Sequence, residues 1–500
     1  MNFLYDALAV IYFTAAGMLF CYGLNAYLMI VFFTRRKQEA LAGMRKELAD
    51  FGDPMQRDDA PLVVTQLPIY NEVNVCARAM CAAAEMQWPK GRHVVQVLDD
   101  STDETRDIVD QTAYELRDKG HDVRVVRRTD RTGFKAGALA HGMRELPADI
   151  YAIFDADFVP PRDFLLKSAP FFQIKPEVGL VQARWGHLNR AKSLLTRAQS
   201  IGIDGHFMVE QSARTWNGLF MNFNGTAGLW RREAIESGGG WQWDTLTEDM
   251  DLSYRVQLKG WKTMFLPELV APAEIPEDVS AFKSQQFRWA KGSIQTAKKI
   301  FPQVLRTKAS LIAKVQAFFH LTHYLVHPLM LILSLLALPV LMTRQYVLGP
   351  AAFAVLAVLL VLAMSAPSTL YLVSQRSAYK DWPLRIAWLP ALIVVGVGLA
   401  VSNTRAVLEA FAGMESPFVR TPKKGDKQIK TYGLRFPWVA LVELGVGVYC
   451  SVSLAHYLVQ GVWFVGPFLG VYSLGYLFIG SLTLLQTMGF TSRSAGAKSP

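Results

Sequence analysis

Two carboxylates one residue apart follow an apolar run of the chain. Asp155 and Asp157 come directly after IYAIF at 150–154, which has the composition of a buried strand. Carboxylates at the end of such a strand can share a hard divalent cation, Mg²⁺ or Mn²⁺, and the cation can bridge the oxygens of a diphosphate. A turn rich in aspartate is the structural alternative. The position of the pair after the apolar run favours the metal site.

A second pair of carboxylates ends another apolar run. Asp99 and Asp100 close HVVQVLDD at 93–100 and are followed by Ser101. Adjacent carboxylates at such an edge can accept hydrogen bonds from the ribose or base of a nucleoside. The structural alternative is a helix N-cap, because Ser101 and Asp103 precede a helical pattern. Both interpretations can hold together.

The segment Thr247-Glu248-Asp249 supplies a third acidic group. Transfer of a group to a hydroxyl needs a carboxylate within hydrogen-bond reach of that hydroxyl, which makes Asp249 a candidate general base and Glu248 its catalytic neighbour. A capping box at the start of the following helix is the alternative.

The run Gln285-Gln286-Phe287-Arg288-Trp289 contains the pattern QxxRW. On a helix, Gln285, Arg288 and Trp289 share one face at spacings of three and four. Arg288 can pair with a departing diphosphate, and Trp289 offers an apolar ring to the face of a sugar. An interfacial Arg–Trp anchor is the alternative for this run taken alone.

These residues fall at the ends of predicted strands and helices. Short apolar runs rich in β-branched residues predict strands at 62–70, 93–100, 122–128 and 150–157, and helical patterns separate them at 74–86 and 103–120. Strands that alternate with helices predict a mainly parallel sheet in an α/β domain over 61–270. Ligands bind such sheets at the carboxyl ends of the strands, where the four aspartates lie.

Long apolar runs flank this domain. Residues 7–33 carry no charged side chain. A run of this length is sufficient for a membrane-spanning helix and too long for a cleavable leader. Arg35, Arg36 and Lys37 follow it, on the side expected to be cytoplasmic. Residues 277–303 alternate apolar side chains with Lys283, Lys291 and other basic groups, which predicts an amphipathic helix on the membrane surface. Further apolar runs lie at 317–342, 349–374, 385–402, 436–458 and 462–487.

Charge restricts the topology and the class of protein. The basic loop at 420–430 is expected to be cytoplasmic, so the Gly-rich run at 385–412, interrupted by Pro390, is predicted to be re-entrant or interfacial. The formal net charge of +10 is explained by cytoplasmic loops, and nucleic-acid binding is not expected. The four cysteines form no CxxC pair, and neither a disulfide framework nor a zinc site is expected.

The four motifs, taken in order, resemble the family 2 glycosyltransferases, in particular the cellulose synthase and mannan-synthase-like branch. The likeness is dense over about 62–295 and looser in the apolar part, where PFVRTPKKG at 417–425 resembles a gating loop with Arg420 in it. The similar segments are LPIYNE (67–72), VLDDSTDET (97–105), RTGFKAGAL (131–139), FDADF (154–158), GLVQARW (179–185), FNGTAGLWR (223–231) and TEDMDL (247–252).

This resemblance implies a GT-A, Rossmann-like fold and inversion at the anomeric carbon. Asp155 and Asp157 would hold the metal and Asp249 would deprotonate the acceptor. The remaining implied roles are nucleoside contacts for Asp99 and Asp100, diphosphate contacts for Lys135 and Arg288, and stacking of Trp289 on the acceptor sugar, with Gln285 as a further substrate-binding residue. A carboxy-terminal barrel of the kind that binds a cyclic dinucleotide in bacterial cellulose synthases is not expected after the last apolar run, and regulation by that ligand in cis is not expected either.

The leading functional hypothesis is a processive synthase in the plasma membrane that extends a β-linked polysaccharide from UDP-glucose or GDP-mannose and passes it across the bilayer, with accessory export proteins as further partners. The alternative is a non-processive enzyme that glycosylates a lipid, as ceramide glucosyltransferases do. A transporter is disfavoured because the putative spans lack charges. The predicted organisation is a transmembrane helix (1–34), a cytoplasmic catalytic domain (35–275), an interfacial helix (276–310), transmembrane and interfacial helices (311–415), a gating-like loop (416–435), a transmembrane pair (436–490) and a tail (491–500).

Overall fold

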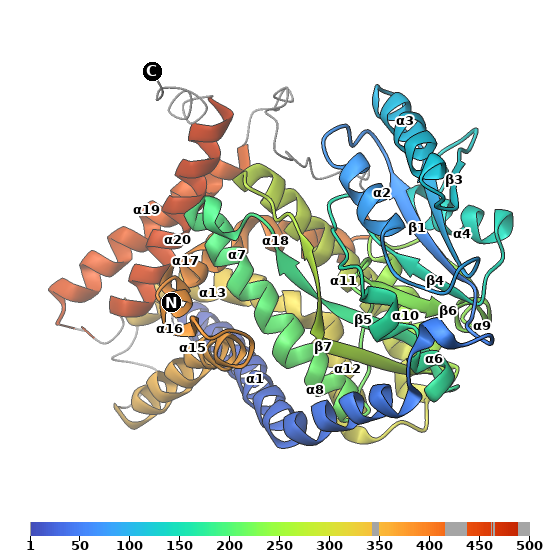
Figure 1. Ribbon diagram of the computed structural model, residues 1–500. Coiled ribbons are helices and arrows are strands. Elements are labelled where there is room, and N and C mark those ends of the chain that lie inside the picture. The colour runs from blue at the N-terminus through green and yellow to red at the C-terminus, as the bar shows by residue number, and fades with distance from the viewer. Residues whose placement is uncertain (1, 343–349, 416–437, 462, 464–465, 489–500) are drawn as a thin grey trace.

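The chain folds into a sheet-containing domain that lies beside a bundle of apolar helices (Figure 1). The computed structural model describes residues 2–342, 350–415, 438–461, 463 and 466–488. The predicted gating-like loop at 416–435 and the tail at 491–500 lie outside the described residues.

Within the described residues the sheet has seven strands in the order β3-β2-β1-β4-β6-β5-β7. The predicted parallel strands are present and pair in register, with β1 between β2 and β4. The other half differs from an all-parallel sheet, because β6 runs antiparallel to both β4 and β5. The strands are β1 (Val63–Ile69), β2 (His93–Asp99), β3 (Val123–Val126), β4 (Ile150–Ile153), β5 (Val178–His187), β6 (Gly228–Arg231) and β7 (Lys262–Ala273).

Helices cover both faces of the sheet. One apolar core packs α2 (Cys76–Ala84), α3 (Thr105–Asp118), α5 (Phe164–Ser168) and α6 (Phe171–Ile174) against one face, and a second core packs α4 (Phe134–Glu145), α9 (Arg232–Ser237) and α10 (Glu248–Leu258) against the other. Side chains that alternate along β1 enter the two cores in turn, as Val63 and Val64 do. The layout is therefore the three-layer α/β sandwich that the strand–helix alternation predicts.

The first helix is longer than the predicted membrane segment. α1 (Asn2–Phe51) continues past residue 34 without a break. Its polar second half packs Met44 and Leu48 onto the core of the sheet domain, and Lys175 of that domain pairs with Glu47 at 2.8 Å. The boundary between the apolar and catalytic parts consequently falls inside one helix (Figure 1).

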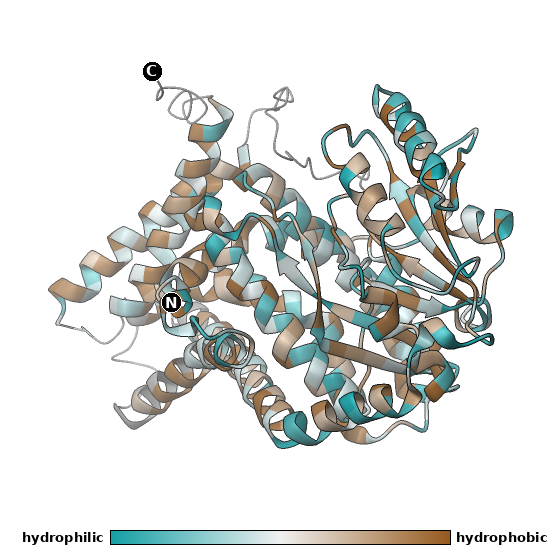
Figure 2. Ribbon diagram, viewed as in Figure 1, coloured by the Kyte–Doolittle hydropathy of each residue, from teal (hydrophilic) through white to brown (hydrophobic). Residues whose placement is uncertain are grey.

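The described part of the chain after residue 310 is helical and largely apolar (Figure 2). Among the described residues, four helical segments are long and apolar enough to cross a membrane: Asp6–Gln56, Leu311–Val340, Trp438–Val459 and Gly466–Thr487. The predicted membrane domain is confirmed at that level. The helices after the sheet domain are α12 (Leu311–Thr322), η4 (His323–Leu325), α13 (Val326–Met342), α15 (Pro350–Ala378), α16 (Trp382–Ile386), α17 (Leu389–Gly398), α18 (Ala400–Phe411), α19 (Trp438–Val459) and α20 (Gly466–Thr487).

The region predicted to be re-entrant is bent. Helices α17 and α18 meet at Leu399 at an angle of 43°, which suits a broken span or a re-entrant loop. A second interruption lies just before Pro390, as the sequence suggested, because α16 ends at Ile386 and α17 begins at Leu389. Pro390 lies in the first turn of α17, where its missing N–H costs no helical hydrogen bond.

The amphipathic segment forms α11 (Val279–Arg306), which lies between the sheet domain and the apolar helices. It is more enclosed than a helix on a membrane surface. Lys283 and Lys291, expected on a solvated face, are buried and pair with Glu443 of α19 and Glu409 of α18. The prediction of a polar face was wrong at these two positions because their partners come from more than a hundred residues away.

Five further helical segments lie along the chain between α1 and β6. They are η1 (Pro54–Gln56), η2 (Arg190–Lys192), α7 (Leu194–Gly205), η3 (His206–Gln211) and α8 (Ser212–Trp216).

Candidate active site

The motifs meet at the carboxyl edge of the parallel strands. Strands β2 and β3 are added on one side of β1, and β4 is added on its other side. Such a switch in strand order opens a crevice for a ligand at the carboxyl ends of the strands. Asp100 follows β2 and Asp155 follows β4, so they border this crevice from opposite sides of β1.

Lys135 and Asp155 form the centre of the site. The Lys135 ammonium, in the first turn of α4, donates to Asp155 Oδ1 at 2.5 Å and to the Gly225 carbonyl at 2.8 Å. The Asp155 amide donates to Thr226 Oγ1 at 2.8 Å, which fixes the residue at the strand end. Burial by itself would lower the pKa of Lys135, but the charges of Asp155 and Glu248 outweigh it and raise that pKa. The lysine is therefore held as a cation beside the carboxylate.

The predicted metal pair has one accessible and one buried member. The Asp155 side chain is 39% exposed, whereas Asp157 is buried in the following turn. No group of three or more metal-ligating side chains occurs among the described residues. Two carboxylates fit Mg²⁺ or Mn²⁺ when phosphate oxygens complete the shell, and the ammonium beside Asp155 marks a place where positive charge is stabilised.

Asp249 lies at the start of α10, and the capping box that was the structural alternative is not formed. Thr247 makes no side-chain bond to the helix and instead shares a hydrogen bond with Thr296 of α11 at 3.0 Å. The Asp249 Oδ1 accepts from the Met250 amide at 2.8 Å. Burial and the nearby Glu248 carboxylate raise the pKa of Asp249 to about 8, and burial also raises the pKa of Glu248. A carboxyl of that pKa is suited to accept a proton near neutral pH.

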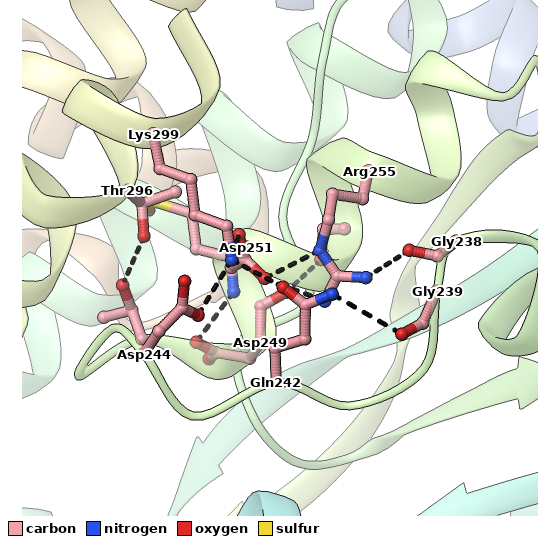
Figure 3. A network of polar contacts seen from close by, with 12 residues as sticks. Gly238, Gly239, Gln242, Asp244, Asp249, Asp251, Arg255, Thr296 and Lys299 are labelled. Carbon is pink, nitrogen blue, oxygen red and sulfur yellow. Dashed lines mark hydrogen bonds and ion pairs between the residues drawn. The ribbon is translucent and has the colours of Figure 1, made fainter.

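A buried polar network fixes α10 against α11 (Figure 3). Asp251 is wholly buried, accepts from Arg255 Nε at 2.8 Å and lies 3.0 Å from Lys299 Nζ of α11. Lys299 also reaches Asp244 at 2.8 Å. The orientation of Asp249 thus depends on the helix that carries QxxRW.

Gly225 lies where the acidic motifs converge. A Cβ at this position would stand 3.2 Å from Asp249 Oδ2 and 3.6 Å from Lys135 Nζ. Its φ of +80° is also one that side chains other than glycine rarely adopt. Both facts indicate that the backbone must approach the catalytic groups closely here.

The QxxRW residues face the same place. Arg288 is close enough to Glu248, Asp155 and Asp249 for their charges to raise its pKa, although burial outweighs them and lowers it. Gln285 and Trp289 line a cavity together with Asp249. The structure therefore brings Asp155, Lys135, Asp249 and the QxxRW helix into one site.

Asp99 and Asp100 are present at the edge but already paired. Asp99 has no exposed side-chain surface, accepts from the Ser101 amide and pairs with Arg127 at 2.8 Å. Asp100 is held by Arg128 through two guanidinium nitrogens. Neither aspartate is a helix N-cap, because α3 begins at Thr105 after Glu104, which makes no side-chain cap bond. The nucleoside role of both remains a prediction.

The cavity beside Asp249 has a volume of about 640 Å³ and extends among the apolar helices. At the catalytic end it is lined by Asp249, Gln285 and Trp289. Farther along it is lined by α1, α13, α15, α17 and α20, through residues that include Leu333, Leu392 and Leu469.

Several site residues were not singled out from the sequence. Arg127 and Arg128 end a predicted strand at the edge that carries the aspartates, so charge complementarity could have indicated them. Gly225 lies within a segment quoted for its resemblance, but nothing local reveals its contact with Asp249. His206 and Glu210 line the cavity and gave no signal beyond their spacing of four.

The comparisons with known proteins concern the family and the fold. A model described as "Glycosyltransferase like family 2" matches residues 61–292. A glucomannan 4-beta-mannosyltransferase of Arabidopsis thaliana is 34% identical over 406 residues, 78% of this chain and 74% of that protein. A probable enzyme of the same name from Oryza sativa subsp. japonica is 33% identical over 452 residues, 86% of this chain and 84% of that protein. The predicted resemblance to the mannan-synthase-like branch is confirmed.

Other relatives match over less of their length. A probable glucomannan 4-beta-mannosyltransferase of Arabidopsis thaliana is 42% identical over 287 residues, and the chain spans 52% of it, about half its length. A solved mannosyltransferase from Pyrobaculum calidifontis, in complex with GDP-Man and Mn²⁺, aligns with 78% of this chain and 99% of its own, at a TM-score of 0.50 and 20% identity. At that identity the likeness concerns the fold, and it confirms the predicted GT-A class.

Proposed function

Because this chain belongs to glycosyltransferase family 2, in its mannan-synthase-like branch, we propose that it transfers a hexose from a nucleotide-diphospho-sugar to a growing β-linked polysaccharide. The observation that carries the proposal is the convergence of Lys135, Asp155 and Arg288 near Asp249, which lines one end of a cavity that reaches the apolar helices.

The donor is bound by its diphosphate. Lys135 and Arg288 supply positive charge where the departing nucleoside diphosphate gains negative charge, and such preorganised charge is usually the largest catalytic contribution. Asp155 and Asp157 would hold Mg²⁺ or Mn²⁺, which neutralises diphosphate oxygens when bound. The names of the relatives and the GDP-Man in the Pyrobaculum structure favour GDP-mannose over UDP-glucose.

The acceptor enters from the cavity. Asp249 takes the proton of the attacking hydroxyl as its oxygen bonds to the anomeric carbon, and the bond to the diphosphate breaks on the opposite face, with inversion. No protein nucleophile is needed for this single displacement. Trp289 stacks on the acceptor sugar and keeps its hydroxyl near Asp249. The polysaccharide leaves through the apolar helices across the plasma membrane.

A lipid acceptor is the second candidate, and the aliphatic lining of the deeper cavity favours it. One experiment separates the two. Purified protein is incubated with Mg²⁺ or Mn²⁺ and a panel of labelled nucleotide sugars, and the product is sized and partitioned between water and organic solvent. Long chains that a β-mannanase or β-glucanase cuts support the polysaccharide synthase. A single extractable glycolipid supports the lipid acceptor, and no transfer from any donor would refute both.

A further inference from the structure

The wall of the cavity contains an unusual helical segment. Helices α7 and α8 form one continuous helix that is interrupted by the π-helical segment η3, His206–Gln211. Such π-turns are rare and occur frequently at functional sites, because the wider turn displaces side chains from the positions that a regular helix gives them. Both His206 and Glu210 of this segment line the cavity, with 28% and 36% of their side chains exposed.

Hydrogen bonds orient these side chains. The side-chain nitrogen Nε2 of Gln211 donates to Asn224 Oδ1 at 2.6 Å, so Asn224 Nδ2 is directed to His206 Nε2 at 2.9 Å. His206 Nε2 therefore accepts, and its Nδ1–H donates to Glu210 Oε2 at 2.9 Å. The three residues form a fixed chain that presents a carboxylate to the cavity.

The charge of Glu210 is stabilised by its surroundings. Burial raises the pKa of Glu210, but the hydrogen bond from His206 and the positive charge of Arg214 outweigh burial and lower it. An ionised carboxylate accepts hydrogen bonds strongly and can receive more than one hydroxyl.

This chain of hydrogen-bonded side chains begins at Asn224, beside the catalytic Asp249. Asn224 precedes Gly225, whose backbone approaches Asp249 Oδ2, and consecutive Cα atoms lie ~3.8 Å apart. Trp289 and Tyr324 line the same cavity and offer aromatic rings to the apolar face of a sugar. Hydroxyl-binding and ring-stacking groups are thus combined next to Asp249.

We infer that His206, Glu210 and Asn224 form an acceptor subsite. This subsite binds those hydroxyl groups of the acceptor hexose that lie next to the reacting hydroxyl. The inference rests on the proposed function and adds to it the residues that select the acceptor. The same hydroxyl chemistry is offered by a polysaccharide end and by the head of a glycolipid, so the test uses both.

The test compares Glu210→Gln, which keeps the size of the side chain, with the matched control Glu145→Gln. Glu145 lies four residues from His141 on α4, 3.8 Å from its Nε2, outside the cavity lining. The equilibrium Kd of β-1,4-mannohexaose and of a long-chain alkyl β-mannoside is measured by tryptophan fluorescence, and acceptor KM is measured in the transfer assay. The Kd of the donor nucleotide serves as the readout of structural damage.

We expect Glu210→Gln to raise the Kd and KM of at least one acceptor about tenfold, the effect of losing a charge-assisted hydrogen bond, with the nucleotide Kd within about twofold of the wild type. The acceptor that responds identifies the source of the sugar. Unchanged binding of both acceptors, or a parallel rise in the nucleotide Kd, would overturn the subsite. Wild-type protein that binds acceptors but turns over no nucleotide sugar would refute the proposed function alone, since the binding measurement still tests the subsite.

Discussion

The buried pair between α11 and α18 offers a test of how the site is held in place. Lys291 has no exposed surface, lies one turn after Arg288 and donates to Glu409 Oε2 at 2.9 Å. Arg405 donates to the other oxygen of Glu409 at 2.7 Å and is itself 47% exposed. Replacing Glu409 by Leu leaves the Lys291 ammonium buried without its carboxylate, whereas Arg405 can turn to solvent.

The expected cost follows from that geometry. Removing one partner of a buried pair lowers the free energy of unfolding by about 3–5 kcal/mol, while replacing both partners by apolar residues is often close to neutral. Glu409→Leu should therefore be strongly destabilising, and the double variant Lys291→Met with Glu409→Leu should recover most of the loss. Because α11 carries Arg288 and Trp289, transfer activity should fall in the single variant and return in the double one.

The free energy of unfolding is measured in detergent by denaturant titration, and the transfer rate of each variant is measured beside it. The control is Glu236→Leu, which breaks an exposed pair with Arg232 four residues away at 2.7 Å and should cost about 0.3–0.5 kcal/mol. If Glu409→Leu is no more destabilising than this control, or if the double variant is as unstable as the single one, the pair does not hold the helix.

Four further predictions concern the site. Asp155→Asn should abolish transfer and weaken binding of Mn²⁺ measured by calorimetry in the presence of the nucleotide diphosphate; unchanged metal binding would remove Asp155 from the metal site. Because Asp249 acts when deprotonated and its pKa lies at about 8, kcat/KM should fall about tenfold for each pH unit below that value, and a flat profile between pH 6 and 8 would contradict its role as base. Gly225→Ala should lower kcat at least ~10²-fold, since the added methyl meets Asp249 and the backbone is strained, while circular dichroism stays unchanged; a normal kcat would show that the loop moves freely. Trp289→Ala should shorten the product on a sizing column while donor hydrolysis persists, and chains of normal length would exclude stacking as the hold on the acceptor.

The raised pKa of Asp249 also affects stability. The folded state binds this proton more tightly than the unfolded state, so the group's contribution to stability is largest at low pH and is lost as pH rises toward about 8. Asp249→Asn should remove that part of the pH dependence from the unfolding free energy. An unchanged pH profile in this variant would assign the titration to another group.

Local patterns were sufficient for the strands, the motifs and the apolar helices. The apolar, β-branched-rich runs at 62–70 and 93–100 and the charge-free run at 7–33 depend only on neighbours in the chain, so β1, β2 and the first half of α1 appear where they were expected. The placement of Asp155 at a strand end followed from the same patterns. The end of α1 was not predictable in this way, because its polar half is held by Glu268 and Lys175 of the sheet domain.

What the sequence by itself determined is the family, the order of the motifs and the residue types that the chemistry needs. Only the tertiary structure decided which of these groups are available to a ligand. Asp99 pairs with Arg127, and Lys291 pairs with Glu409. Each pair joins residues distant in sequence, and it forms because the buried charge of Asp99 or Lys291 must be paired. The π-turn that brings His206 and Glu210 into the cavity, and the approach of Gly225 to Asp249, likewise depend on packing between helices, which no local pattern records.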